Sequence, residues 1–211
     1  MKISPGDLLL YGVTDRRHLS GESLEHAVEE AIKGGMTCVQ LREKHLGDEK
    51  FRALALKVQE VCARYGVPFI INDRVEIAKE IGADGVHVGQ EDMSVAKARE
   101  LLGEDFIIGT SAHNVKEAQK AIADGADYIG SGAVFQSSTK TDTVSLSLEE
   151  LKNITALGIP VVAIGGVTAQ NAHLLKGSGI SGIAVSSAVF AQKDKKAAAE
   201  LLRAVLKDTV K

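Results

Sequence analysis

The chain contains no tryptophan, and aromatic residues make up only 4% of its 211 residues. Large rings therefore cannot fill much of an interior, although hydrophobic residues reach 45%, which is enough for a substantial core. Such a core has to be built from alanine, valine, isoleucine and leucine. Parallel sheets that are buried on both faces have this composition, so an α/β fold is the first expectation.

Cysteine is also scarce. Cys38 lies in an apolar, strand-like run and Cys62 in a helical pattern, and their spacing matches neither a disulfide framework nor a metal site. The formal net charge of −3 offers no general attraction for nucleic acid or for an anionic membrane. We therefore expect a protein of the reducing cytoplasm that has no nucleic-acid partner.

Long apolar runs are missing as well. Residues 1–12 include a single short one at residues 8–10, far below the length of a signal-peptide core or a membrane span. The sequence thus predicts neither export nor membrane insertion. No change of composition or Pro/Ser-rich linker divides the chain, and one domain over residues 1–211 is expected.

The sequence does contain a repeated alternation of helical segments and short apolar strands. Several helical runs end at glycine and are followed within about three residues by a β-branched run. Glycine commonly ends a helix in this way, at its C-terminal cap. Segment 23–33 is the clearest helix, because its apolar residues recur on one stripe with acidic residues opposite. Eight strands are predicted near residues 8–14, 37–41, 68–71, 85–88, 106–110, 127–130, 160–164 and 182–185.

Eight alternating pairs predict an α/β fold of the closed kind, a single-domain (β/α)8 TIM barrel, since right-handed crossovers bring the last strand back beside the first. An open, doubly wound sheet is the alternative. The loops after the strands form the active face of such barrels, so polar residues there are the first functional candidates. The longest irregular segment, residues 131–145, is a candidate active-site loop.

The second predicted strand runs into Gln40-Leu41-Arg42-Glu43-Lys44. Arg42 and Lys44 are two residues apart, and an extended chain points both to the same side. That arrangement suits the binding of a multiply charged phosphate ester. The alternative is an ordinary solvated rim without a ligand.

Acidic residues follow the next two predicted strands. Asn72-Asp73 ends the third strand, and Gln90-Glu91-Asp92 follows the fourth. Two carboxylates on neighbouring strands, close to basic residues, suit Mg²⁺, which takes few protein carboxylates and completes its octahedron with phosphate oxygens and water. Each acid precedes a helical run, so helix capping is the alternative for either one.

Hydroxyl groups follow the fifth and sixth strands. Ser111 could donate to a phosphate oxygen, although an N-cap of the following helix is the alternative. The loop after the sixth strand offers more donors for a ligand, namely Ser137, Ser138, Thr139 and Lys140.

Small residues follow the last two strands. Gly165-Gly166 and Ser186-Ser187 each precede a predicted helix start, where free backbone N–H groups bind anions. Barrels most often bind phosphate at strands seven and eight. Two ordinary tight turns are the alternative.

The histidines indicate no zinc site, because they lack metal-ligand spacing. His87 alternates within a predicted strand, and the interpretation is a hydrogen-bonded histidine that points into the core.

Taken together, the motifs resemble the thiamine phosphate synthase family. The matching motifs are, in chain order, Leu10-Tyr11-x-Val13-Thr14-Asp15, Gln40-x-Arg42-x-Lys44, Asn72-Asp73-Arg74, Gly85-Val86-His87-x-Gly89-Gln90-x-Asp92, Thr139-Lys140-x-Asp142 and Gly165-Gly166. They span nearly the whole chain, and several linked motifs in order are far more specific than any one of them.

The resemblance implies an enzyme with two phosphorylated small-molecule substrates. A hydroxymethylpyrimidine diphosphate would be joined to a thiazole phosphate, which forms thiamine phosphate and releases diphosphate with Mg²⁺ as the cofactor. Asp73 and Asp92 would bind the metal. The residues that stabilise the leaving diphosphate would be Arg42, Lys44 and Lys140.

The resemblance also assigns the binding residues. The pyrimidine diphosphate would be held by Gln40, Leu41, Arg42, Glu43, Lys44, Asn72, Ser111 and Lys140. The thiazole phosphate would be held by Ser137, Ser138, Thr139, Gly166, Ser186 and Ser187. No nucleophile stands beside a general base, so the carbon–oxygen bond is expected to break, through a pyrimidine cation, before the thiazole nitrogen attacks.

Some positions depart from the family pattern. The family commonly has proline where this chain has Ala133 and Gln136, threonine at Ser137 and an aliphatic residue at Ser186. The hydroxyl and small-residue character is kept, so these changes bear on loop rigidity and turnover more than on substrate class.

Two other functions remain as alternatives. A sister family of thiazole tautomerases uses the same barrel for proton transfer, with His113 as a candidate acid or base, but it should not need the paired carboxylates Asp73 and Asp92. A non-catalytic barrel that binds a phosphorylated ligand should have lost metal or diphosphate-binding groups. A homo-oligomer is possible, and the sequence does not set its size.

Overall fold

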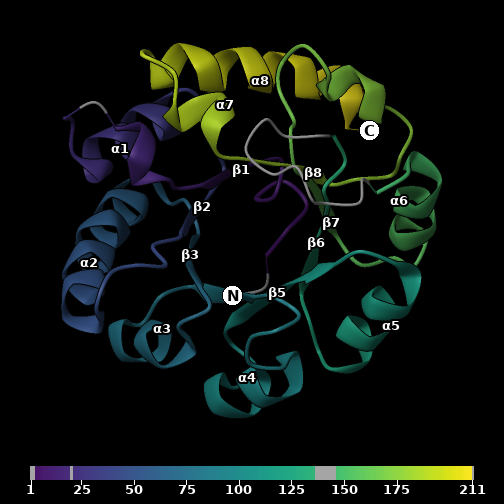
Figure 1. Ribbon diagram of the computed structural model, residues 1–211, viewed down its shortest axis with the longest axis horizontal. Coiled ribbons are helices and arrows are strands. Elements are labelled where there is room, and N and C mark those ends of the chain that lie inside the picture. Colours follow the sequence, from purple (N-terminus) through teal and green to yellow (C-terminus); the bar gives the residue numbers. More distant parts are fainter. Residues whose placement is uncertain (1–2, 20, 136–145, 211) are drawn as a thin grey trace.

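The structure is a computed structural model that describes residues 3–19, 21–135 and 146–210. Eight parallel strands form a closed barrel, and helices surround it (Figure 1). The strands are β1 (Leu10–Val13), β2 (Cys38–Leu41), β3 (Phe69–Asn72), β4 (Gly85–Val88), β5 (Ile107–Ala112), β6 (Tyr128–Gly132), β7 (Val161–Ile164) and β8 (Gly182–Val185). Because β1 pairs with β8, the predicted barrel is confirmed and the open sheet is excluded.

The helices form the outer ring of the barrel (Figure 1). They are η1 (Arg16–His18), α1 (Leu24–Lys33), α2 (Asp48–Tyr65), α3 (Val75–Ile81), α4 (Val95–Leu102), α5 (Val115–Ala123), α6 (Leu148–Thr155), η2 (Ala172–Leu175), α7 (Ser187–Phe190) and α8 (Lys195–Thr209). The β7–β8 connection, residues 165–181, is described throughout and carries only the short 3-10 helix η2 in place of an α-helix. None of the helices in the described ranges is both long and apolar enough to cross a membrane.

Local signals explain where α1 begins and which face it buries. The side chain of Ser23 accepts a hydrogen bond from the backbone N–H of His26 and caps the helix. The predicted apolar stripe is the buried face of this helix, made of Leu24, Ala27, Val28, Ala31 and Ile32. Periodicity and capping therefore agree at this helix, as the sequence predicts.

The core has two layers. The larger layer lies between the outer faces of the strands and the helices. The inner layer fills the barrel itself, and its largest side chains are the fully buried Tyr11 and Tyr128. The amino-terminal segment contributes Ile3 and Leu8 to this inner layer, and the backbone of Leu8 lies against Gly182 at the start of β8. The barrel is thus closed at the amino ends of its strands, which leaves the carboxyl ends for a ligand.

Candidate active site

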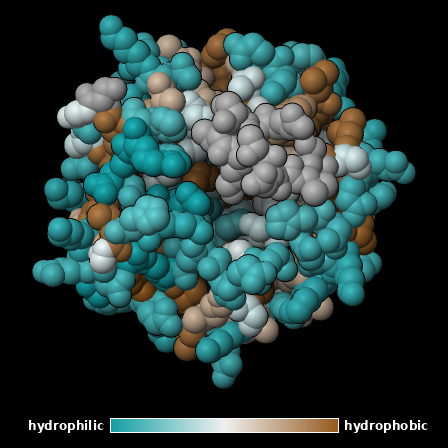
Figure 2. All heavy atoms as spheres, viewed as in Figure 1, coloured by the Kyte–Doolittle hydropathy of each residue, from teal (hydrophilic) through white to brown (hydrophobic). Residues whose placement is uncertain are grey.

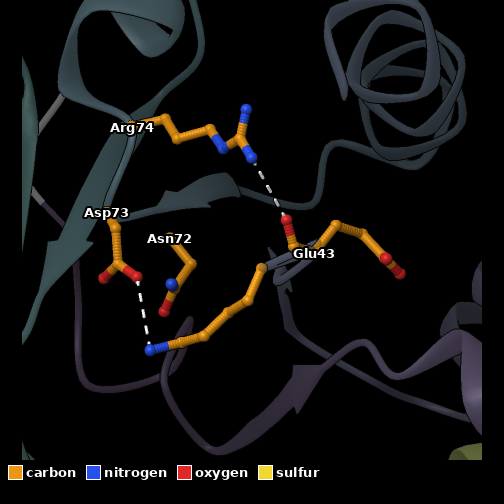
Figure 3. A pocket seen from close by; sticks show the side chains of 5 residues that line it. Glu43, Asn72, Asp73 and Arg74 are labelled. Carbon is orange, nitrogen blue, oxygen red and sulfur yellow. Dashed lines mark hydrogen bonds and ion pairs between the residues drawn. The ribbon is translucent and has the colours of Figure 1, made fainter. Parts of the chain in front are cut away.

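A pocket lies at the carboxyl ends of β2 and β3. Its volume is about 150 Å³, and its lining is Glu43, Lys44, Asn72, Asp73 and Arg74. Asn72 and Asp73 point to the same side of the pocket (Figure 3). Lys44 Nζ lies 3.7 Å from Asp73 Oδ2. The structure therefore brings together residues that the sequence predicted separately on two strands.

The backbone of Asp73 sets the direction of its carboxylate. Its φ is 63°, a left-handed value that few residues other than glycine adopt and that aspartate tolerates better than most. The Asp73 N–H donates to the carbonyl oxygen of His87 at 2.9 Å, which ties the end of β3 to β4. A residue held in this conformation at a strand end is typical of a functional site.

Asp73 and Asp92 are close enough to interact. Burial, followed by a hydrogen bond and the charge of Asp92, raises the pKa of the Asp73 carboxyl above its ordinary value, and Lys44 offsets this only in part. Asp92 Oδ2 also accepts a hydrogen bond of 2.9 Å from the Gly89 N–H. A carboxyl whose pKa is raised by burial and by a second acid is electrostatically short of positive charge.

The capping alternative is wrong for both acids. The N-cap of α3 is Arg74, and the N-cap of α4 is Ser94, whose side chain accepts from the Lys97 N–H. It is wrong for Ser111 too, because Asn114 caps α5. Ser111 lies inside β5 and not after it, since this strand extends two residues beyond its predicted end.

The two neighbours of Lys44 on the β2 side behave differently from each other. Glu43 turns its carboxylate away from Asp73, and its Oε1 pairs with Arg16 Nε at 3.0 Å (Figure 3). Arg42 is partly buried, and its backbone N–H donates to Thr14 Oγ1 at 3.1 Å. No described residue forms an ion pair with Arg42, so its guanidinium stays available for a phosphate.

Arg74 belongs to the pocket lining although sequence reasoning gave it no role of its own. Its guanidinium lies 4.4 Å from the centre of the Phe51 ring and pairs with Asp48 at the start of α2. These contacts hold the loop after β2 against the end of β3. The motif Asn72-Asp73-Arg74 was the available signal, but the sequence could not show where this arginine points.

Gln40 lies inside the barrel, only 4% exposed. Its Nε2 donates to the Tyr11 hydroxyl at 2.8 Å, and that hydroxyl lies 2.7 Å from the Tyr128 hydroxyl. His87 Nδ1 lies 3.1 Å from the Tyr128 hydroxyl, and His87 Nε2 lies 3.1 Å from Ser111 Oγ. The interpretation of His87 as a hydrogen-bonded core histidine is confirmed, whereas the sequence gave no role to Tyr11 or Tyr128.

The second candidate region lies at the carboxyl ends of β7 and β8, which are neighbours in the barrel. Gly165 and Gly166 have φ values of 99° and 65°, which glycine adopts without strain. Ser186 is the N-cap of α7 and Ser187 its first residue, so the first N–H groups of this helix have no partner within it. The region offers backbone donors, as an anion site requires.

The predicted loop residues Gln136, Ser137, Ser138, Thr139 and Lys140 lie outside the described residues, and their assigned roles remain predictions. The described ends of this loop are fixed. Leu146 N–H donates to the Ala133 carbonyl at 2.7 Å, and Phe135 N–H donates to the Gly165 carbonyl at 3.0 Å. The loop therefore starts and ends beside the Gly165-Gly166 turn.

Comparison with known proteins identifies the family. A family model described as thiamine monophosphate synthase matches residues 10–189. The thiamine-phosphate synthase of Ruminiclostridium cellulolyticum is 52% identical over 93% of this chain and 94% of its own length. The thiamine-phosphate synthase of Methanobrevibacter smithii is 51% identical over 93% of this chain and 94% of its own length.

Solved structures agree with this match. A thiamine phosphate pyrophosphorylase from Pyrococcus furiosus superposes with a TM-score of 0.90 at 36% identity, over 98% of this chain and 99% of that chain. Fold, motif order and sequence identity thus point the same way. The chain belongs to the thiamine monophosphate synthase family.

Proposed function

We propose that this chain is a Mg²⁺-dependent thiamine phosphate synthase, a transferase that joins a pyrimidine diphosphate to a thiazole phosphate. The observation that carries the proposal is the meeting of Asp73, Asp92 and Lys44 at the ends of three strands, in a chain about half identical to curated thiamine-phosphate synthases. Two acids and a lysine that meet at neighbouring strand ends suit a diphosphate with its metal.

The acid pair fits Mg²⁺ better than a metal that needs a full protein cage. Among the described residues no group of three or more His, Cys, Asp or Glu side chains could hold a metal ion. Two carboxylates suffice for Mg²⁺, whose remaining ligands are phosphate oxygens and water. The raised pKa of Asp73 adds support, because a divalent cation beside the two acids would remove their repulsion. When bound, Mg²⁺ would neutralise charge on the leaving diphosphate.

The reaction needs charge stabilisation more than a nucleophile. The bond between the pyrimidine methylene carbon and the diphosphate oxygen breaks, the electron pair leaves with the diphosphate, and the thiazole nitrogen lone pair forms the new carbon–nitrogen bond. Arg42 and Lys44 would hold the diphosphate as its charge grows. Neither cysteine is suited to act as a nucleophile, because both are buried, and burial raises the pKa of the Cys62 thiol to about 12 and that of Cys38 well above its ordinary value.

The thiazole phosphate would bind at the ends of β7 and β8. Gly166 and the N–H groups at the start of α7, beside Ser186 and Ser187, would hold its phosphate. We assign Ser137, Ser138 and Thr139 to the same phosphate and Lys140 to the diphosphate, as the family motifs imply. With the pyrimidine diphosphate at β2–β5, the two substrates would meet across the open end of the barrel.

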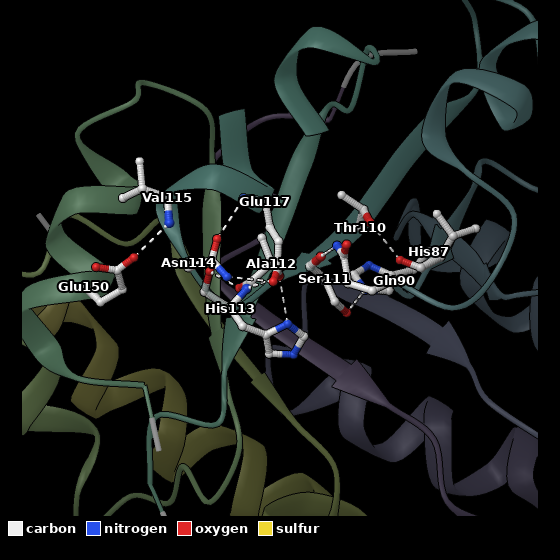
Figure 4. Close-up of polar contacts among 12 residues, drawn as sticks. His87, Gln90, Thr110, Ser111, Ala112, His113, Asn114, Val115, Glu117 and Glu150 are labelled. Atoms are coloured by element: carbon white, nitrogen blue, oxygen red, sulfur yellow. Dashed lines mark hydrogen bonds and ion pairs between the residues drawn. The ribbon is translucent and has the colours of Figure 1, made fainter. Parts of the chain in front are cut away.

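The tautomerase alternative has less support. The ring of His113 is exposed and lies 3.0 Å from Glu117 Oε2 on α5 (Figure 4). The paired acids Asp73 and Asp92, which proton transfer on a thiazole does not need, are both present. The curated relatives at about 50% identity are named synthases.

The test is a product assay with both substrates and Mg²⁺. The purified chain should form thiamine phosphate and diphosphate in equal amounts, and a chelator should stop the reaction. Formation of no thiamine phosphate would overturn the proposed activity. Full activity in chelator would leave the synthase activity standing and overturn its Mg²⁺ dependence.

A further inference from the structure

A line of hydrogen bonds crosses the inside of the barrel from Gln40 to Ser111. It joins Gln40 on β2, Tyr11 on β1, Tyr128 on β6, His87 on β4 and Ser111 on β5. Every link is between 2.7 and 3.1 Å long. Figure 4 shows the last link, with the His87 ring beside Ser111. Both ends of the line are residues assigned to the pyrimidine diphosphate, whereas its three inner residues have no assigned role.

Neighbouring glycines make room for this line. A Cβ at position 109 would lie 2.0 Å from Tyr128 Cζ, and a Cβ at position 130 would lie 3.2 Å from His87 Cε1. Gly109 pairs with both His87 and Tyr128 in the barrel register, so it sits between the two rings. A buried hydroxyl without a partner is costly, and here each hydroxyl of the pair Tyr11 and Tyr128 has two.

The donor at one end sets one consistent direction along the line when each hydroxyl uses its hydrogen within it. Gln40 Nε2 can only donate, so the Tyr11 hydroxyl accepts from it and donates its own hydrogen to the Tyr128 hydroxyl. The Tyr128 hydroxyl then has its own hydrogen left for His87 Nδ1. A neutral imidazole that accepts at Nδ1 carries its hydrogen on Nε2 and donates it to Ser111 Oγ.

Ser111 is left with one defined hydrogen. Because its oxygen already accepts from His87, its own O–H hydrogen is left to donate to another group. If the Gln40 amide were turned so that Oε1 faced Tyr11, every bond would reverse and Ser111 would donate to His87. The direction of the line thus decides whether the site offers a donor or an acceptor at Ser111.

We propose that His87, protonated on Nε2, is a positioning residue that makes the Ser111 hydroxyl a fixed donor to a hydrogen-bond acceptor of the pyrimidine diphosphate. This inference rests on the proposed function for the identity of the ligand. A hydroxyl held in one orientation before the substrate arrives does not lose rotational freedom on binding, which improves affinity. The hydroxyls of Tyr11 and Tyr128 connect the Gln40 amide to His87, so the orientation of that amide sets which ring nitrogen of His87 carries the hydrogen.

The first test reads the tautomer directly in the ligand-free protein. Nitrogen-15 NMR at pH 7 should show the His87 ring neutral, with its hydrogen on Nε2. The Tyr128→Phe variant removes the hydroxyl that fixes the ring, so its His87 should populate both tautomers. A wild-type ring with its hydrogen on Nδ1 would overturn the proposed direction.

The second test uses steady-state kinetics of thiamine phosphate formation. The His87→Leu variant should raise the KM for the pyrimidine diphosphate about tenfold and leave the KM for the thiazole phosphate unchanged, since a neutral hydrogen bond is lost. His87→Gln places an amide N–H near the position of Nε2 and should recover part of the loss. Tyr65→Phe is the matched control, because it removes a tyrosine hydrogen bond to Glu29 on the outer helices.

A double-mutant cycle separates positioning from a structural role. If His87 acts through Ser111, the double variant His87→Leu/Ser111→Ala should be no worse than Ser111→Ala alone. Additive losses, or equal rises in both KM values, would overturn the proposal. A wild-type chain that forms no thiamine phosphate would sink the proposed function, while the tautomer in the ligand-free protein would still decide the direction of the line.

Discussion

The two halves of the open end of the barrel differ in the chemical groups that they offer to a ligand. The half at β2–β5 is built from charged side chains, with Lys44, Asp73 and Asp92 in one pocket region. The half at β6–β8 has no charged side chain in its described segments 132–135, 165–167 and 185–188. One half thus suits a metal-bound diphosphate that leaves during the reaction, and the other a monophosphate that only has to be held. Changes to the charged side chains of the first half should affect turnover, and changes in the second half should affect binding.

The largest effect is expected at the acid pair. Asp73→Asn and Asp92→Asn should each lower kcat at least about 100-fold, because the Mg²⁺ that would balance the charge on the diphosphate is no longer held. The Asp73→Asn variant should unfold no more easily than the parent chain in metal-free buffer, since the change removes a repelling charge. Glu104→Gln, which removes an exposed carboxylate at the opposite end of the barrel, is the control. Full turnover in both aspartate variants would break the comparison.

The second-largest effect is expected at Lys44. Lys44→Ala removes the ammonium group that faces Asp73, and we expect kcat/KM for the pyrimidine diphosphate to fall about 10- to 100-fold. The KM for the thiazole phosphate should change little. Steady-state kinetics with each substrate varied in turn would check this, and an equal effect on both KM values would show that the two halves are not separate.

A change at Gly166, in the β6–β8 half, is expected to affect binding of the thiazole phosphate and not the chemical step. A Cβ at its left-handed φ of 65° strains the backbone, so Gly166→Ala should cost about 1 kcal/mol of stability and raise the KM for the thiazole phosphate. Single-turnover chemistry at saturating thiazole phosphate should stay close to that of the parent chain. A slowed chemical step at saturation would contradict a purely binding role for this turn.

His87 links the site to the pH dependence of stability. Burial lowers its pKa from 6.5 to about 4, so the unfolded chain binds a proton between these values while the folded protein does not. Stability should therefore fall by about 2 kcal/mol as the pH drops from 6.5 to 4, less than the full shift implies because the ring is partly buried. Denaturant unfolding of the parent chain and of His87→Gln would measure this. An identical pH slope in both would refute it.

The sequence predicted the fold because its signals are local. Each observed strand overlaps its predicted range, and only β3, β5 and β6 extend one or two residues further. The missing α-helix between β7 and β8 was not predicted, because the length of that interval was read as a helix. Strand ends also mattered for function, since the extension of β5 turns Ser111 from a loop residue into a residue of the barrel wall.

The charged residues of the site could be predicted from the sequence. The residues that are positioned by packing inside the barrel could not. Asp73 and Asp92 were placed together from the order of strands alone, although capping could not be excluded until Arg74 and Ser94 took the N-cap positions. The contact between Tyr11 and Tyr128 spans 117 residues and depends on barrel closure. No local pattern encodes it.

Figure 2 shows a face that is largely hydrophilic, with hydrophobic residues scattered over it. Three of the large exposed hydrophobic residues of the described chain, Leu56, Leu174 and Leu201, lie on three different helices, α2, η2 and α8. A homo-oligomer, expected from the sequence as a possibility, therefore stays a prediction.

The central claim is that Asp73 and Asp92 hold Mg²⁺ for a diphosphate, and calorimetry with inorganic diphosphate tests it most directly. The parent chain and the Glu104→Gln control should bind diphosphate tightly with Mg²⁺ present and weakly without it. The Asp73→Asn variant should show the weak binding under both conditions. Binding that is equally tight with and without Mg²⁺, or a Mg²⁺ effect that survives in Asp73→Asn, would contradict the account.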